Sequence, residues 1–300
     1  GIDEAIQIWD VESGERIQTM KNVLGWLHSL TWSDDEAKIV TAESDYIYSG
    51  YLTIWDVVHG VPTSTVEGHR GRVHSVDWSP DGAYIVSGGV DRTVRVWKAT
   101  NGELVTTLEG HTDQVTSVAW SPDGRLIASG QGEGFWDGPP SFDSSVSKDS
   151  VYIWDTENSD LIRTLDIPTG NVGSIAWCPD GERVAVGGGM GSILIFDVNT
   201  GCLLDSLEGH EDVIWDVSWS SEGSTLVSTD YNWMVTVWDV DTGESLSTIG
   251  NRKKVSFSPD GTLIAEATGI GMYTDRLRVR NITDRDATVS TYEAKDVEYV

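Results

Sequence analysis

The sequence predicts an all-β protein built from one repeated unit of four short strands. The stretch "EGHRGRVHSVDWSPDGAYIVSG" (67–88) recurs 42 residues later as "EGHTDQVTSVAWSPDGRLIASG" (109–130). Seven segments of the type "VRVW" end at spacings of 46, 42, 57, 42, 42 and 42 residues, on Trp9, Trp55, Trp97, Trp154, Phe196, Trp238 and Arg280. Apolar and polar residues alternate with period two in these segments, and no segment shows sustained helical periodicity. This pattern favours stacked β units over a helical solenoid.

Each unit divides into four strands in a fixed order. The first, "QVTSVAW" (114–120), alternates and stops at "SPDG", a turn in which Pro presets φ and Gly accepts a positive φ. The second, "LIASG" (126–130), is largely apolar, so we expect it to be buried on both faces. The third is the "VRVW" type, and the fourth, "ELVTTLEG" (103–110), follows a Thr-Asn-Gly turn.

The composition is strongly acidic, with 48 Asp and Glu against 20 Lys and Arg and a net charge of −28. Such a surface repels nucleic acid and anionic membranes, and it suits a basic partner, a high-salt cytoplasm or simple solubility. Two cysteines, Cys178 and Cys202, provide neither a disulfide framework nor a zinc set. With no visible signal peptide and no apolar run of membrane-spanning length, the expected location is cytoplasmic.

Four antiparallel strands per unit, with Gly-His before the first and Trp-Asp after the third, resemble the WD-repeat β-propeller family. The resemblance covers nearly the whole chain: six of the seven third strands end on an aromatic residue, and five of those continue to Asp. It implies one domain over 1–300, a seven-bladed β-propeller of four-stranded antiparallel blades, with a loop insertion at 131–147.

The ends of the sequence align within one blade of this arrangement. The chain opens in the turn before a third strand, and "AKDVEYV" (294–300) aligns with a first strand. The seam blade is therefore expected to be incomplete, with its second strand missing. We interpret the sequence as an excerpt of a longer chain; a defective seam is the alternative.

The family also implies an internal hydrogen-bond set in a blade, made by a His, a Ser or Thr, an Asp and the Trp of the third strand. Three sets align: His69, Ser87, Asp91 and Trp97; His111, Ser129, Asp149 and Trp154; and His210, Ser228, Asn232 and Trp238. Buried imidazole and indole groups need such partners, so these histidines are predicted to be structural rather than catalytic. The fifth and seventh units lack the set and are expected to be the softest.

None of the motifs in the sequence indicates a catalytic, phosphate-binding or metal-binding site. No phosphate loop, nucleophile elbow or zinc spacing is present, and "GGGMGS" (187–192) reads as a turn between strands. Calcium held by turn aspartates is an alternative, although no loop shows alternating oxygen ligands. No catalytic residue, metal or cofactor is therefore predicted.

The remaining candidate for a functional site is a surface that binds a partner. In the family, partner peptides dock where strand four leads to strand one and strand two leads to strand three. By alignment, the residues on that face include Trp26, His28, Arg72, His74, Gln114, Thr116, Trp215 and Tyr231, with Trp136 from the insertion. Trp, Tyr and Arg dominate binding hot spots. The alternative is that these side chains pack on one another and hold the ring together.

We therefore expect a non-enzymatic scaffold that binds a protein or peptide, with basic residues, on the channel-mouth face. One alternative is a catalytic propeller, a hydrolase or lyase with His28 or His74 as base. Another is a sensing or assembly module of a larger signalling protein, with that face covered by other domains of the same chain.

Overall fold

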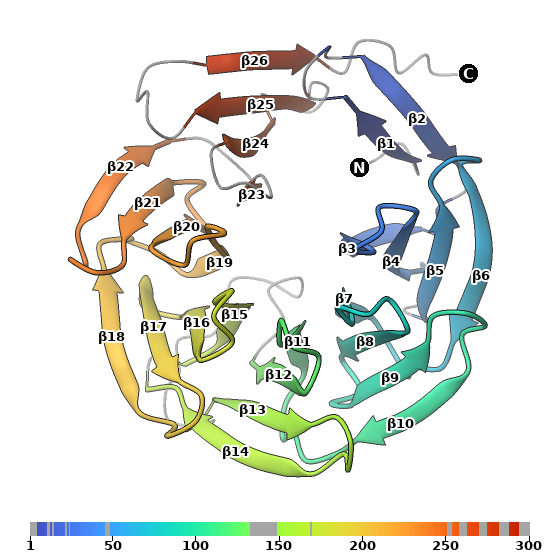
Figure 1. Ribbon diagram of the computed structural model, residues 1–300, viewed down its shortest axis with the longest axis horizontal. Coiled ribbons are helices and arrows are strands. Elements are labelled where there is room, and N and C mark those ends of the chain that lie inside the picture. Colours follow the sequence, from blue (N-terminus) through green and yellow to red (C-terminus); the bar gives the residue numbers. More distant parts are fainter. Residues whose placement is uncertain are drawn as a thin grey trace. The chain divides into compact units, whose positions relative to one another are not determined.

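The structure is a computed structural model that describes residues 5–10, 13, 15–21, 23, 25–45, 49–132, 149–168, 170–250, 254–257, 263–269, 275–281 and 288–293. Every element in these residues is a strand, and the strands form six four-stranded antiparallel sheets and one two-stranded sheet (Figure 1). The all-β prediction is confirmed. None of the described residues forms a helix that could cross a membrane.

The chain divides into two compact units. The first unit comprises residues 1–8 and 16–175, and the second comprises residues 9–15 and 176–300. The division falls within the short sheet and within β15, so each unit is described by the strands it contains.

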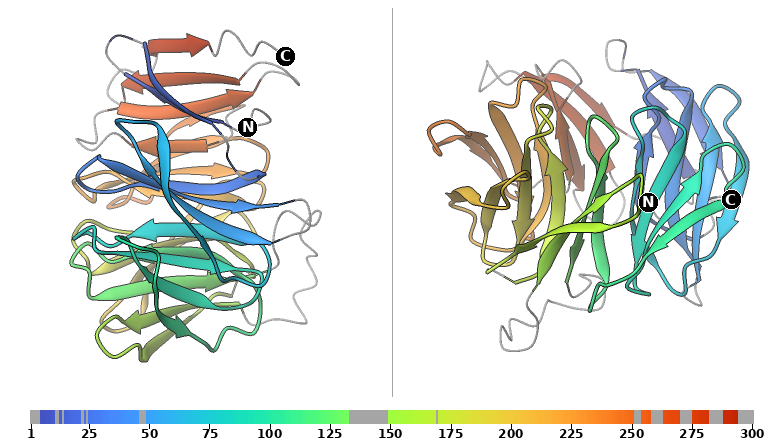
Figure 2. Two further views of the ribbon diagram at one scale, coloured as in Figure 1. Left: turned by 90° about the vertical axis from the view of Figure 1, so that its right-hand side faces the viewer. Right: turned by 60° about the horizontal axis from the view of Figure 1, so that its bottom comes forward.

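The first unit contains the short sheet and three complete ones, seen from other sides in Figure 2. The short sheet is β1 (Ala5–Trp9) and β2 (Arg16–Lys21), and the next is β3 (Trp26–Trp32), β4 (Lys38–Ser44), β5 (Gly50–Asp56) and β6 (Val61–Glu67). Then come β7 (Val73–Trp78), β8 (Tyr84–Gly89), β9 (Val94–Lys98) and β10 (Leu104–Leu108), followed by β11 (Val115–Trp120), β12 (Leu126–Gln131), β13 (Ser150–Asp155) and β14 (Leu161–Asp166).

The second unit contains the remaining strands. The sheet that begins with β15 (Val172–Trp177) continues with β16 (Arg183–Gly188), β17 (Ser192–Asp197) and β18 (Leu203–Glu208). The last two sheets are β19 (Ile214–Trp219), β20 (Thr225–Asp230), β21 (Val235–Asp239) and β22 (Ser245–Ile249), and β23 (Lys254–Phe257), β24 (Leu263–Gly269), β25 (Asp275–Asn281) and β26 (Thr288–Glu293).

The seven predicted third strands are β1, β5, β9, β13, β17, β21 and β25, so the repeat identified every sheet. Within the described part of the chain, β1 pairs with β2 alone. The predicted closing strand at 294–300 lies outside the described residues. So does most of the predicted insertion, but its boundary at 131 is wrong, because Gln131 is the last residue of β12.

The second strands are buried, as their apolar composition predicts: in β12 every residue after the first is buried. The tryptophans that end three of the third strands, Trp97, Trp154 and Trp238, are at most 3% exposed. The glycine after the serine of the repeat has a packing role. A Cβ on Gly88 would lie 2.4 Å from Cγ1 of Val115, in the first strand of the neighbouring sheet, so only glycine admits this close approach.

Candidate partner-binding surface

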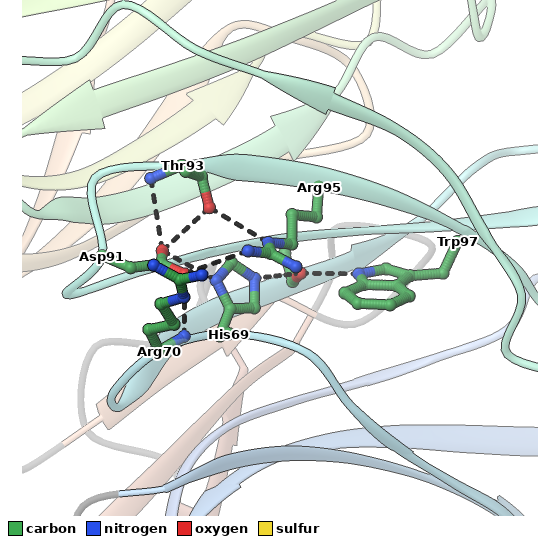
Figure 3. Close-up of polar contacts among 7 residues, drawn as sticks. His69, Arg70, Asp91, Thr93, Arg95 and Trp97 are labelled. Atoms are coloured by element: carbon green, nitrogen blue, oxygen red, sulfur yellow. Dashed lines mark hydrogen bonds and ion pairs between the residues drawn. The ribbon is translucent and has the colours of Figure 1, made fainter.

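A buried hydrogen-bond chain joins the strands of the sheet β7–β10 (Figure 3). The indole N–H of Trp97 donates to Oγ of Ser87 over 2.8 Å, and this Oγ lies 2.7 Å from Nε2 of His69. Nδ1 of His69 lies 2.9 Å from a carboxylate oxygen of Asp91. A carboxylate only accepts, so Nδ1 carries the hydrogen, and a neutral imidazole receives the Ser87 hydroxyl hydrogen at Nε2. The structure thus brings together the four residues of the first predicted set.

Asp91 also fixes the turn between β8 and β9. Its carboxylate accepts the backbone N–H of Arg70 over 2.9 Å and the hydroxyl of Thr93 over 2.8 Å. Burial acts to raise the pKa of Asp91, but the hydrogen bonds that its carboxylate accepts from His69, the Arg70 N–H and Thr93 outweigh it and hold that pKa below its ordinary value. The histidine set therefore anchors the surface turn to the core of the sheet.

The Ser–His–Asp distances in this set resemble those of a hydrolase triad. Ser87, however, is 0% exposed. A nucleophile must reach a substrate atom, so this serine is placed for packing and hydrogen bonding, not for attack.

In the sheet β11–β14 the predicted acceptor is wrong. Nδ1 of His111 lies 2.9 Å from Oε1 of Gln131, not from Asp149, and Nε2 lies 2.6 Å from Oγ of Ser129. Asp149 instead accepts the backbone N–H of Asn171. Burial lowers the pKa of His111 to about 4, because the amide of Gln131 supplies no negative charge to offset it.

In the third set, the predicted hydrogen-bond partner of the histidine is also wrong. Nδ1 of His210 lies 3.0 Å from a carboxylate oxygen of Asp230, while Asn232 is exposed in the turn. Gln131 and Asp230 each stand two residues after the serine of the second strand, and side chains at i and i+2 of a strand share a face. In the first set this position is Gly89, which explains why the acceptor comes from the turn there.

The sheet β3–β6 carries a variant without the histidine. The indole N–H of Trp55 donates to Oγ1 of Thr41 over 2.9 Å, and Thr41 donates in turn to the fully buried carboxylate of Glu43. Val23 stands at the position of the histidine. The i+2 spacing from Thr41 was the signal in the sequence that pointed to Glu43.

Four of the predicted surface residues share one structural feature, a β-bulge near the start of a first strand. In each case the pairing with the second strand skips one residue, and the skipped residues are His28, His74, Thr116 and Trp215. A bulge turns a side chain away from the regular alternation of the strand and is common beside functional sites. The four aligned positions therefore have the same backbone geometry in four sheets.

In the first unit the bulged residues bridge neighbouring sheets. The rings of His28 and His74 lie 6.3 Å apart, and Nε2 of His74 lies 2.9 Å from Oε1 of Gln114. Burial, followed by the charges of His74 and Arg72, lowers the pKa of His28 to about 4. Nε2 of His74 thus meets an amide oxygen of the neighbouring sheet.

Two further predicted residues of this unit differ in exposure. Trp26 is 48% exposed, as expected of a contact residue. Arg72 is 8% exposed, so the prediction that it lies on the surface is wrong, and its charge acts on His28.

In the second unit the predicted aromatic residues form a cluster. The rings of Trp215 and Tyr231 lie 6.2 Å apart, and those of Tyr231 and Trp233 lie 6.4 Å apart and within 19° of parallel. Tyr231 is 39% exposed, and the two tryptophans are half-buried. Sequence reasoning missed Trp233, although the exposed turn "DYNWM" (230–234) offered a second large aromatic two residues after Tyr231.

Trp136, the predicted contact of the insertion, lies outside the described residues. Among those described, no group of three or more His, Cys, Asp or Glu side chains could hold a metal ion. Cys178 is buried, and burial raises its thiol pKa to about 11, which disfavours a reactive thiolate.

Comparison with known families agrees with this architecture. The family model "WD domain, G-beta repeat" matches residues 60–98 and 102–138, and the model "Anaphase-promoting complex subunit 4 WD40 domain" matches residues 149–222. These segments contain the sheets with the His69 and His111 sets and the one that begins at β15.

Two curated proteins are similar to parts of the chain. The WD repeat-containing protein VIP3 of Arabidopsis thaliana is 42% identical over 77 residues, which are 21% of this chain and 24% of that protein. The Retinoblastoma-binding-like protein E of Dictyostelium discoideum is 34% identical over 58 residues, 19% of this chain and 11% of that protein. The chain therefore matches about a quarter or less of the length of either relative. With the repeated four-stranded sheets and their Trp–Ser–His chains, these matches establish that the chain belongs to the WD-repeat family.

Proposed function

We propose that this chain is a non-enzymatic scaffold that binds a peptide or protein segment on a surface of its second unit, at the bulged end of the first strand β19. WD-repeat proteins serve in general as protein interaction scaffolds. The observation that carries the proposal for this surface is the aromatic cluster at that end, formed by the exposed Tyr231 and the half-buried Trp215 and Trp233. Large amphipathic rings, partly exposed and held by a rigid sheet, are the typical anchors of binding hot spots.

The acidity of the chain supports a partner segment with basic residues. Opposite charge raises the association rate and disfavours acidic competitors, even where it adds little to affinity. Covering of this surface by another domain of a longer polypeptide is compatible with the same geometry, because the contact chemistry is the same.

No observation favours catalysis. The serine of the best-formed Ser–His–Asp set is fully buried, and the bonded nitrogen of His74 faces an amide. We therefore propose the scaffold without an enzymatic alternative.

The test compares wild-type protein with a Trp215→Ala/Tyr231→Ala variant as baits, after unchanged melting has been established. A Trp32→Ala variant is the matched control, because Trp32 is 39% exposed and lies outside the aromatic cluster. We expect the wild-type and control baits to capture a protein that the double variant does not capture. In calorimetry with that protein in purified form, we expect the double variant to bind it at least 10-fold more weakly than wild type does. Equal binding by all three baits would refute the proposed surface. Trp136→Ala, tested alone, measures the contribution of the insertion.

A further inference from the structure

The surroundings of the aromatic cluster indicate which side chain it receives. Between Arg183 and Arg252 the sequence contains no Lys or Arg. The same stretch contains eleven acidic residues: Asp197, Asp205, Glu208, Glu211, Asp212, Asp216, Glu222, Asp230, Asp239, Asp241 and Glu244. The cluster lies within this acidic stretch of the second unit.

Three of these acids lie close to the cluster along the backbone. The N–H of Tyr231 donates to the carbonyl of Val213 over 2.8 Å, which places Tyr231 next to the loop that contains the exposed Glu211 and the half-buried Asp212. Asp216 follows the bulged Trp215 directly. Negative charge beside aromatic faces attracts a cation, because each ring also presents a negative quadrupole.

The turn that presents the rings is rigid. Asp230 donates its N–H to the carbonyl of Met234, and its carboxylate accepts the Met234 N–H over 2.9 Å while also meeting His210. Trp233 has φ +66°, a conformation that costs energy for a bulky residue and persists only where surrounding contacts impose it. The rings are thus held in place before any ligand arrives.

We propose that the Trp215–Tyr231–Trp233 cluster accepts an arginine side chain of the partner segment. This inference rests on the proposed function and specifies the partner's chemistry at that site. The planar guanidinium stacks on aromatic rings and loses less hydration than an ammonium, so arginine suits near-parallel rings better than lysine.

The first test uses acetyl-arginine amide and its neutral isostere, acetyl-citrulline amide, as probes of the full chain. Tryptophan indole N–H signals are followed by NMR and assigned with Trp215→Phe and Trp233→Phe variants. We expect the arginine compound to shift both indole signals, the shifts to survive in Tyr231→Phe, and Tyr231→Leu to reduce them. Equal shifts with citrulline, or no shift of either indole, would overturn the inference.

The second test separates this inference from the proposed function. An array of random peptides is synthesised with either arginine or citrulline at the centre and is probed with labelled wild-type, Tyr231→Leu and Trp32→Ala chains. We expect citrulline to weaken binding roughly 3- to 30-fold for wild type and for Trp32→Ala, and to have no effect on Tyr231→Leu. Peptides that depend on Tyr231 but not on arginine would overturn the inference and leave the proposed function intact. Binding that is indifferent to Tyr231 would overturn both.

Discussion

A single side chain decides which kind of oxygen each buried histidine meets at Nδ1. His69 and His210 meet carboxylates, whereas His111 meets the amide of Gln131. An amide oxygen accepts the Nδ1 hydrogen as a carboxylate does, but it adds no charge that would stabilise an imidazolium. The three sets therefore share geometry and differ in electrostatics, and the ring of Tyr152 stacked 4.3 Å from His111 completes an uncharged environment.

This difference predicts the effect of Gln131→Glu. The new carboxylate would hydrogen-bond Nδ1 of His111 and raise the pKa of that histidine from about 4 by at least one unit. A titration of the histidine ring signals by NMR measures the shift. His210, in the other unit, is the internal control, and an unchanged His111 pKa would show that burial alone determines it.

At the scale of the element, the contact between neighbouring sheets depends on small residues in the second strands. Gly88 meets Val115, Gly130 meets Val172, and Gly187 meets Ile214, each with less than 2.5 Å between a built Cβ and the neighbouring methyl carbon. Gly88 and Gly130 belong to the repeated "SG", which thus has two physical roles, whereas Gly187 follows Val186. The serine closes the buried hydrogen-bond chain, and the glycine lets the next sheet approach.

Gly88→Ala is accordingly expected to lower the free energy of unfolding by about 1–3 kcal/mol, since the added methyl group overpacks a rigid interior. Denaturant unfolding measures the change. The compensating variant Gly88→Ala/Val115→Ala removes the opposing methyl groups, so its destabilisation should be smaller than the sum of the two single changes. Strict additivity would mean that the two residues do not compete for space.

At the scale of the whole molecule, individual carboxylic acids make the stability of the fold depend on pH, and two of them do so in opposite directions. The depressed pKa of Asp91 adds stability above the pKa of the unfolded chain, and this stability is lost as the pH falls. Asp77 acts in the opposite sense. It accepts the N–H of Trp120 in the neighbouring sheet over 2.8 Å, yet burial raises its pKa to about 7.

The Asp77 contribution has a definite pH window. Between about pH 4 and pH 7 the folded chain retains a proton that the unfolded chain has released, so this group lowers stability as the pH rises, by up to about 1.4 kcal/mol per pH unit. Asp77→Asn should remove that slope. Melting temperatures of both proteins across pH 4–8 in constant salt test this; parallel profiles would contradict it.

The all-β class, the four-strand unit and all seven third strands could be predicted from the residues alone, because these features depend on local alternation and turn residues. The alignment of the repeats also pointed to the aromatic residues Trp215 and Tyr231. The fold was needed to show that Gln131 and Asp230 meet the histidines, that Arg72 is buried and that Trp233 joins the cluster. Those contacts join residues from different strands or sheets, and they follow from the i+2 geometry of a strand, from bulges and from packing between sheets, none of which the repeat spacing encodes.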